Sequence, residues 1–132
     1  MYKVLKLGNL TSNSSLIQPP AGFKWKILAA AAWISVGTGT GTRSIVGYIY
    51  PGSSSTPSIN FLPSASGSLN TSGDTIGTVG YVGISASPFT AGSYAQWSSC
   101  PELGDQDQIQ FVVSLVSGDS YSYVLSVLEE LE

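Results

Sequence analysis

Along much of the chain, apolar and polar residues alternate with a period of two, which is the pattern of β-strands. The alternation is most regular over residues 108–115 and again over residues 121–127, with the turn Ser117-Gly118-Asp119 between them. Two alternating runs joined by a glycine-containing turn predict a β-hairpin, in which each strand turns one apolar face inward.

Earlier segments follow the same pattern less regularly. We expect further strands at residues 2–7, 15–18, 24–36, 43–50, 58–62, 75–85 and 94–98. Eight or nine strands, separated by turns rich in glycine, serine, threonine and proline, predict an all-β fold, an antiparallel β-sandwich of about eight strands. A jelly-roll-like order and an immunoglobulin-like order both fit this pattern. No break in composition divides the chain, so residues 1–132 are expected to form a single β-sandwich domain.

The predicted strand at residues 24–36 is apolar on both of its faces. A period of two places one set of side chains on one face, namely Trp25, Ile27, Ala29, Ala31 and Trp33. The other face carries Leu28, Ala30, Ala32 and Ile34. A strand with one solvated face keeps polar residues there, so we expect a loop, a terminus or another subunit to cover the second face. The candidate interface with another subunit consists of Trp25, Leu28, Ala30, Ala32 and Ile34.

Charged residues are scarce. They make up 10% of the chain, against roughly 25% in an average soluble protein, and serine, threonine and glycine take their place. A surface of hydroxyl groups can be buried against a neighbour without desolvating ions, so the composition favours a subunit of an assembly.

The composition also excludes some partners. The five basic residues form no run that would neutralise a row of phosphates, so nucleic acid is not an expected partner. The longest apolar run, residues 27–34, is too short to span a bilayer, so no membrane partner is expected. Residues 1–6 lack the apolar stretch of a signal peptide, and none is expected.

The chain has little equipment for catalysis. Histidine is absent and Cys100 is the single cysteine, which removes Ser-His-Asp, Cys-His and histidine–metal chemistry. Three carboxylates, Glu102, Asp105 and Asp107, lie close together before a predicted strand. We expect a solvated loop there, with an oxygen-ligand Ca²⁺ site as the alternative. The last residues, 127–132, contain three glutamates and are expected to end as a solvated tail. No enzyme activity, cofactor or metal is expected.

Aromatic residues offer an alternative function. Most of the tryptophans and tyrosines stand at strand positions that alternate with polar residues, so core packing is the first interpretation. Exposed aromatic rings can also stack on sugar rings. Tyr50, Tyr94 and Trp97 are the candidate stacking residues for a carbohydrate- or receptor-binding protein.

Three segments together resemble small virion proteins of bacteriophages. Residues 17–27, IQPPAGFKWKI, are similar to an opening motif of that family, P-x-G-x-x-W-x-hydrophobic. Residues 41–49, GTRSIVGYI, resemble its glycine and threonine turn followed by an arginine that leads the next strand. Residues 118–129, GDSYSYVLSVLE, resemble its closing hairpin, G-D-x-Y-x-Y.

The resemblance implies a jelly-roll-like sandwich located in the virion, which assembles in the host cytoplasm. It implies a capsid decoration or cement subunit, or alternatively part of a tail fibre or spike. The implied partners are copies of the chain itself, commonly in a homotrimer, and the major capsid protein or another virion protein. The resemblance carries over no catalytic residue. It implies a structural role for Arg43, which at the start of a strand pairs with a carboxylate or caps backbone carbonyls.

Overall fold

Strands account for nearly all the regular structure of the protein. The computed structural model describes residues 1–53 and 58–132. Its elements are β1 (Tyr2–Leu10), β2 (Phe23–Ser35), β3 (Arg43–Tyr50), the 3₁₀ turn η1 (Pro51–Ser53), β4 (Ile59–Gly67), β5 (Thr75–Val82), β6 (Ala91–Trp97), β7 (Glu102–Leu103), β8 (Gln108–Ser114) and β9 (Ser120–Leu131). The predicted all-β class is confirmed.

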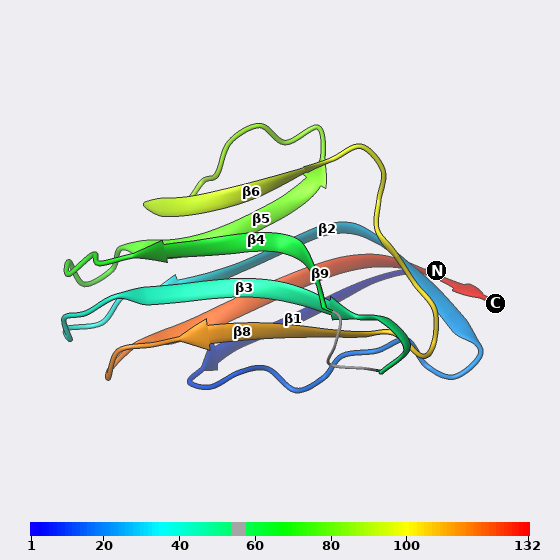
Figure 1. Ribbon diagram of the computed structural model, residues 1–132, viewed down its shortest axis with the longest axis horizontal. Coiled ribbons are helices and arrows are strands. Elements are labelled where there is room, and N and C mark those ends of the chain that lie inside the picture. Colours follow the sequence, from blue (N-terminus) through cyan, green and yellow to red (C-terminus); the bar gives the residue numbers. More distant parts are fainter. Residues whose placement is uncertain (54–57) are drawn as a thin grey trace.

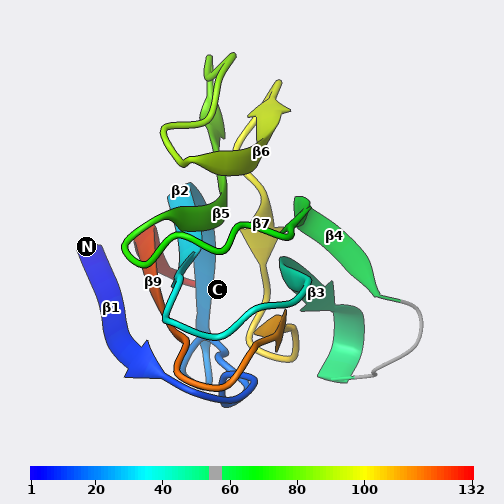
Figure 2. The same cartoon turned by 90° about the vertical axis from the view of Figure 1, so that its left-hand side faces the viewer.

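The strands form two sheets that pack face to face (Figures 1 and 2). The larger sheet has the order β1-β9-β2-β5-β6, with the short β7 paired to β2, and the smaller has the order β4-β3-β8. Residues 13–17 lie along the free side of β8, where Ile17 and Ile109 form an isolated bridge. With this segment counted, the strand order is that of a jelly roll. The predicted jelly-roll-like antiparallel sandwich is therefore confirmed, with β6 and the short β7 as additional strands.

A bulge in β2 decides which of its side chains face inward. The register with β9 shifts between Ile27 and Ala29, so Leu28 is the extra residue and the inward parity changes there. Before the bulge Trp25 and Ile27 are buried. After it the buried positions are Ala30, Ala32 and Ile34.

This arrangement corrects the predicted interface. Four of the five candidates, Trp25, Ala30, Ala32 and Ile34, belong to the core between the two sheets of the same chain. They are 0–3% exposed, so no second subunit can contact them. Leu28, at the bulge, is half-buried. The prediction assumed an unbroken period of two through residue 28, and it therefore assigned side chains to the wrong faces of the strand.

The predicted C-terminal hairpin is also wrong. β8 pairs with β3 in the smaller sheet, whereas β9 lies between β1 and β2 in the larger sheet. Residues 115–119 therefore pass from one sheet to the other. Both strands bury alternate side chains in the shared core, as the alternation indicated, but this pattern is the same for a hairpin and for a connection between facing sheets.

Strands β5 and β6 run parallel and are joined by residues 83–90. This connection runs back over the outward-facing side of the larger sheet. There the ring of Phe89 stacks on Trp33 with 5.9 Å between the centroids. A Cβ on Gly77 would lie 2.6 Å from Cδ2 of Phe89, so only glycine leaves room for that ring. One of the expected covers, a loop, therefore lies over the end of the second apolar face of β2.

Candidate functional site

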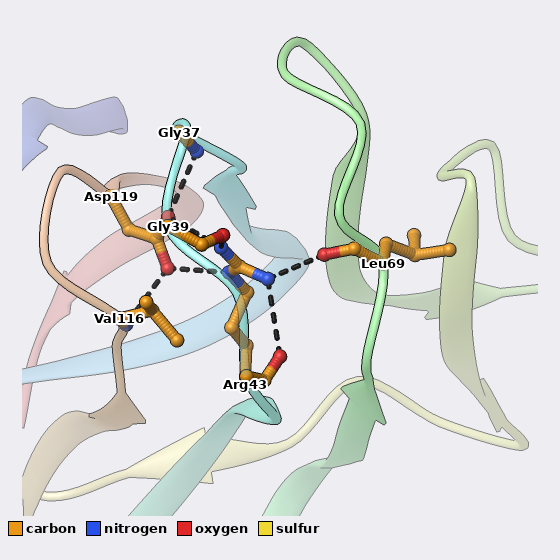
Figure 3. Close-up of polar contacts among 7 residues, drawn as sticks. Gly37, Gly39, Arg43, Leu69, Val116 and Asp119 are labelled. Atoms are coloured by element: carbon orange, nitrogen blue, oxygen red, sulfur yellow. Dashed lines mark hydrogen bonds and ion pairs between the residues drawn. The ribbon is translucent and has the colours of Figure 1, made fainter.

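An ion pair orders the loops at one end of the sandwich, the left-hand end in Figure 1. Arg43 begins β3, and Asp119 lies just before β9. Nε of Arg43 donates to Oδ2 of Asp119 over 2.6 Å, and Nη2 donates to Oδ1 over 3.2 Å (Figure 3). Both side chains are fully buried, so this is a two-point pair screened from water.

The remaining hydrogen-bonding groups of the pair hold three loops. Nη2 of Arg43 also donates to the carbonyl of Gly39 over 2.7 Å, and Nη1 donates to the carbonyls of Gly41 and Leu69. The carboxylate of Asp119 accepts the backbone N–H groups of Gly37 and Val116, each over 2.9 Å (Figure 3). The β2–β3, β4–β5 and β8–β9 connections therefore meet at one buried charge pair. Arg43 has the two contacts that the resemblance implied, a carboxylate and capped carbonyls.

The surroundings of Asp119 act on its pKa in opposite directions. Burial raises the pKa, because it penalises the charged form. The hydrogen bond from Arg43 and the backbone donors of Gly37 and Val116, with the positive charge of Arg43, outweigh burial and hold the pKa below its ordinary value. Asp119 is therefore a carboxylate, and the group is suited to structural work rather than to proton transfer at neutral pH.

The acidic loop lies at the opposite end of the molecule, where its carboxylates bind backbone. Asp107 accepts the N–H groups of Gly52 and Gly104, each over 2.9 Å, and Asp105 accepts the N–H of Gly22 over 2.8 Å. The predicted solvated loop is thus more ordered than expected. Among residues 1–53 and 58–132, no group of three or more metal-ligating side chains is found.

The glutamate at position 129 departs from the expected solvated tail. β9 continues to Leu131, and Glu129 is buried. Its Oε1 lies 2.8 Å from Nζ of Lys3, and its Oε2 accepts the indole N–H of Trp25 over 2.9 Å. The hydrogen bonds from Lys3 and Trp25 lower the pKa of Glu129 against the opposing effect of burial. The sequence did indicate this burial, because residue 129 continues the alternation in which residues 121, 123, 125 and 127 face inward.

The outer face of β1, β9 and β2 is the candidate contact surface. Residues that pair across these three strands lie side by side in rows. One central row is Val4, Ser126 and Ala29, and the other is Lys6, Val124 and Ala31. The row beyond them at one end is Tyr2, Leu128 and Lys26. Val4 is 67% exposed, and Ala29, Ala31, Val124 and Ser126 are half-buried. We call these five residues the outer face. They carry no charge, but Lys6 on edge strand β1 lies next to Val124 in one of the two central rows, and Lys26 lies in the row beyond them.

The three candidate stacking residues lie on separate surfaces. The indole N–H of Trp97 donates to the carbonyl of Phe61 over 3.1 Å, and its ring stacks on Phe61 between the sheets. Tyr94 has the opposite parity on the same strand and is 43% exposed. Tyr50 belongs to the smaller sheet, stacks on Tyr48 and donates its hydroxyl to Gln110. The three candidate residues of the alternative function therefore do not form one shared stacking surface.

Cys100 is a free, half-buried thiol. No cavity is found among the described residues. In residues 1–53 and 58–132, no helix has the length and hydropathy needed to cross a membrane.

Comparisons with known proteins give distant structural likeness only. No family model matches the chain, and no curated protein matches its sequence. A solved structure of Eiger TNF from S. frugiperda is 12% identical, with a TM-score of 0.37, over 80% of this chain and 58% of that chain. A subunit from disulfide-linked pili, the Bacillus endospore appendages, is 14% identical, with a TM-score of 0.33, over 99% and 85%.

A third likeness is to a structure of infectious bursal disease virus, Gx strain. It is 10% identical, with a TM-score of 0.19, over 98% of this chain and 40% of that chain. The chain thus spans 58% of the length of the Eiger protein and 40% of that of the viral chain. The class of the protein, a jelly-roll β-sandwich with the added strands β6 and β7, rests on its own strand order and register.

Proposed function

We propose that this protein is a structural subunit of a bacteriophage particle, a decoration or cement subunit that stabilises the capsid shell through protein–protein contacts. The observation that carries the proposal is the outer face, a part of the larger sheet made of small, apolar and hydroxyl side chains. Burying these five side chains removes apolar surface from water and desolvates no ion among them, and Lys6, on edge strand β1, has a long side chain that keeps its charge in water.

The buried ion pair supports the same role. Arg43 and Asp119 fix three loops at one end of the sandwich, and the acidic loop fixes the other end. A rigid subunit loses little conformational entropy when it binds, which favours repeated contacts in an assembly. We further propose that copies of the chain associate with one another, and that the partner in the particle is the major capsid protein or another virion protein.

The contact can be tested with particles that lack the chain. The unmodified protein, added to particles from a phage in which its gene is deleted, should sediment with them. Ala31→Glu places a charge in the outer face and should leave most of the protein in the supernatant. Ala21→Glu is the matched control, because Ala21 is exposed in the loop before β2, and it should sediment like the unmodified protein.

Circular dichroism of both variants verifies that they are folded. Failure of the unmodified protein to sediment, or absence of its peptides from the natural particles by mass spectrometry, would refute the proposed location. Equal binding by Ala31→Glu would exclude the outer face as the contact.

A further inference from the structure

β6 is an edge strand with an unoccupied side. It pairs with β5 along one side, and no described residue forms a backbone hydrogen bond with its other side. The connection of residues 83–90 does not occupy that side, since Phe89 and Ser87 lie over the outward faces of Gly77 and Gly92. The free N–H and C=O groups of β6 therefore run along one border of the larger sheet.

Strand direction identifies which residues present those groups. The inward-facing Val36, directly after β2, exchanges hydrogen bonds with Gly73 and Asp74 on the β5 side. β6 runs opposite to β2 and lies on the other side of β5. The N–H and C=O groups of its inward-facing residues therefore also point towards β5. The outward-facing residues Gly92, Tyr94 and Gln96 direct theirs to the open side, because successive residues of a strand alternate. All three are exposed.

Other edges of the sandwich are covered or protected. The edge of β8 binds residues 13–17, where Ile17 and Ile109 exchange backbone hydrogen bonds of 2.8 and 2.7 Å. The edge of β4 is bonded by side chains of β6, with Ser93 donating to the carbonyl of Ser64. β1 carries Lys3 and Lys6, and lysine on an edge strand opposes pairing. β6 has neither charge nor proline.

We propose that two copies of this chain pair through β6, antiparallel about a two-fold axis at Tyr94, so that their larger sheets become one continuous sheet. In this register the free N–H and C=O groups of Tyr94 lie opposite the same groups of Tyr94 in the second copy. The free groups of Gly92 lie opposite those of Gln96 in the second copy. Each of the three residues on one copy then exchanges two backbone hydrogen bonds with the other copy.

The sequence of β6 fits its own antiparallel copy. On the inward face, small Ala91 lies opposite large Trp97, and Ser93 lies opposite Ala95. On the outward face, Gly92 lies opposite Gln96, and the two Tyr94 rings form a cross-strand aromatic pair. No like charges meet, although a two-fold axis brings identical surfaces together. Tyr81 and Val82 on neighbouring β5, 41% and 50% exposed, extend the apolar surface beside this edge.

The pairing rests on the proposed self-association and specifies its contact. An isologous contact closes on itself as a dimer, in place of the trimer implied by the phage resemblance. The outer face on β1, β9 and β2 remains open in this dimer, so each subunit keeps its surface for another protein.

Cross-linking tests the register. In a Cys100→Ser background, Tyr94→Cys should form a covalent dimer under mild oxidation, because the two Cα atoms would lie about 5.5 Å apart, within disulfide range. Gln96→Cys is the matched control on the same strand and face. Its two copies would lie about 14 Å apart along the strands, so it should stay uncross-linked. Equal cross-linking of both variants, or none with Tyr94→Cys, would overturn the register.

Light scattering on the purified protein tests the dimer itself. The unmodified chain should have twice the mass of one chain. Tyr94→Pro should halve that mass, because it removes a central N–H that β5 does not use, and proline is tolerated on such an edge. Val4→Pro, on the outer side of edge strand β1, should remain dimeric.

Each other outcome overturns the two-fold pairing. Dissociation by Val4→Pro would indicate pairing of β1 with β6 in a head-to-tail array, and a trimer would indicate another contact. A monomer at micromolar concentrations would remove the proposed self-association as well, whereas an oligomer without the Tyr94→Cys cross-link would remove only the contact through β6.

Discussion

The indole N–H of Trp25 donates to a carboxylate oxygen of Glu129 over 2.9 Å, within the buried side of the larger sheet. Glu129 also binds Lys3, so the single carboxylate connects strands β2, β9 and β1. A buried carboxylate requires such partners, because an unpaired charge away from water is strongly unfavourable.

Replacing Glu129 should therefore destabilise the fold far more than replacing its neighbour. Glu129→Leu removes the acceptor of Trp25 and the partner of Lys3, and it should lower the thermal midpoint. Glu130→Leu is the matched control, because Glu130 is exposed and should change the midpoint little. Thermal unfolding followed by circular dichroism measures both, and equal effects would contradict the role of Glu129.

The Arg43–Asp119 pair should contribute most through the penalty of breaking it. Asp119→Asn leaves a buried guanidinium without its counter-charge, and Arg43→Met leaves a buried carboxylate; each should cost about 3–5 kcal/mol of unfolding free energy. The double variant Arg43→Met/Asp119→Asn should cost less than the sum of the single changes, because no buried charge remains.

Urea denaturation measures these free energies. Asp74→Asn, at the same end of the sandwich, is the control, since Asp74 makes no ion pair among the described residues and should shift stability little. Additive single and double variants would show that the two side chains act independently.

Acid should weaken the fold through Asp119. Its folded pKa is lowered, so its contribution is fully present above the ordinary carboxyl pKa of the unfolded chain and is lost as the pH falls through the folded value. Unfolding free energy measured from neutral pH downward should decline in this window. In Asp119→Asn the unfolding free energy should decline less steeply with falling pH. Adding Glu129→Gln should reduce the remaining decline further, because the pKa of Glu129 is lowered too.

Tyr121 should limit stability at high pH. Its side chain is fully buried, its hydroxyl has no hydrogen-bond partner among the described residues, and burial, with a smaller effect of Tyr123, raises its pKa to about 12. Tyr121→Phe removes the unsatisfied hydroxyl and should stabilise the protein by about 1 kcal/mol at neutral pH.

The pH dependence has a defined sign. Because the folded pKa is raised, the neutral hydroxyl favours the fold below the ordinary tyrosine value near 10, and this contribution is lost as the pH rises towards 12. Tyr121→Phe should remove that loss, whereas Tyr2→Phe, at an exposed position, should retain it. An unchanged alkaline profile in Tyr121→Phe would contradict this assignment.

Gly80 should be intolerant of a methyl group. A Cβ there would lie 2.7 Å from Cζ2 of Trp97 and 2.8 Å from Cδ2 of Leu62, both packed between the sheets. Gly80→Ala should cost about 1–3 kcal/mol through overpacking. Gly67→Ala is the matched strand control, because its Cβ would meet its nearest neighbours at an ordinary 3.5 Å. Denaturant midpoints compare the two variants.

Local alternation predicted strands well. Residues 43–50 were predicted as a strand, and β3 has these bounds. Parity along 121–127 also indicated the inward residues of β9, because one face of that strand is in the core. What alternation could not supply was the partner of each strand. β8 and β9 look like a hairpin in sequence, but the choice between pairing and crossing to the facing sheet depends on contacts with distant strands.

Long-range contacts also explain the site residues that were missed. Asp119 was read only as a turn residue, and its bonds to Arg43 join positions 76 residues apart. The outer face was missed because the bulge at Leu28 reverses the parity of β2. β6 was predicted as a short strand at 94–98, but its parallel pairing with β5 required the outward path of residues 83–90.

The central position of β9 has a consequence for synthesis. Tyr2 pairs with Leu128 and Trp33 pairs with Ser122, so β1 and β2 receive their common neighbour only from residues 120–131. While the ribosome makes the first hundred residues, both strands emerge without the strand that separates them. Nascent chains should therefore depend on chaperones that shield unpaired strands, and the larger sheet should close after translation has passed β9.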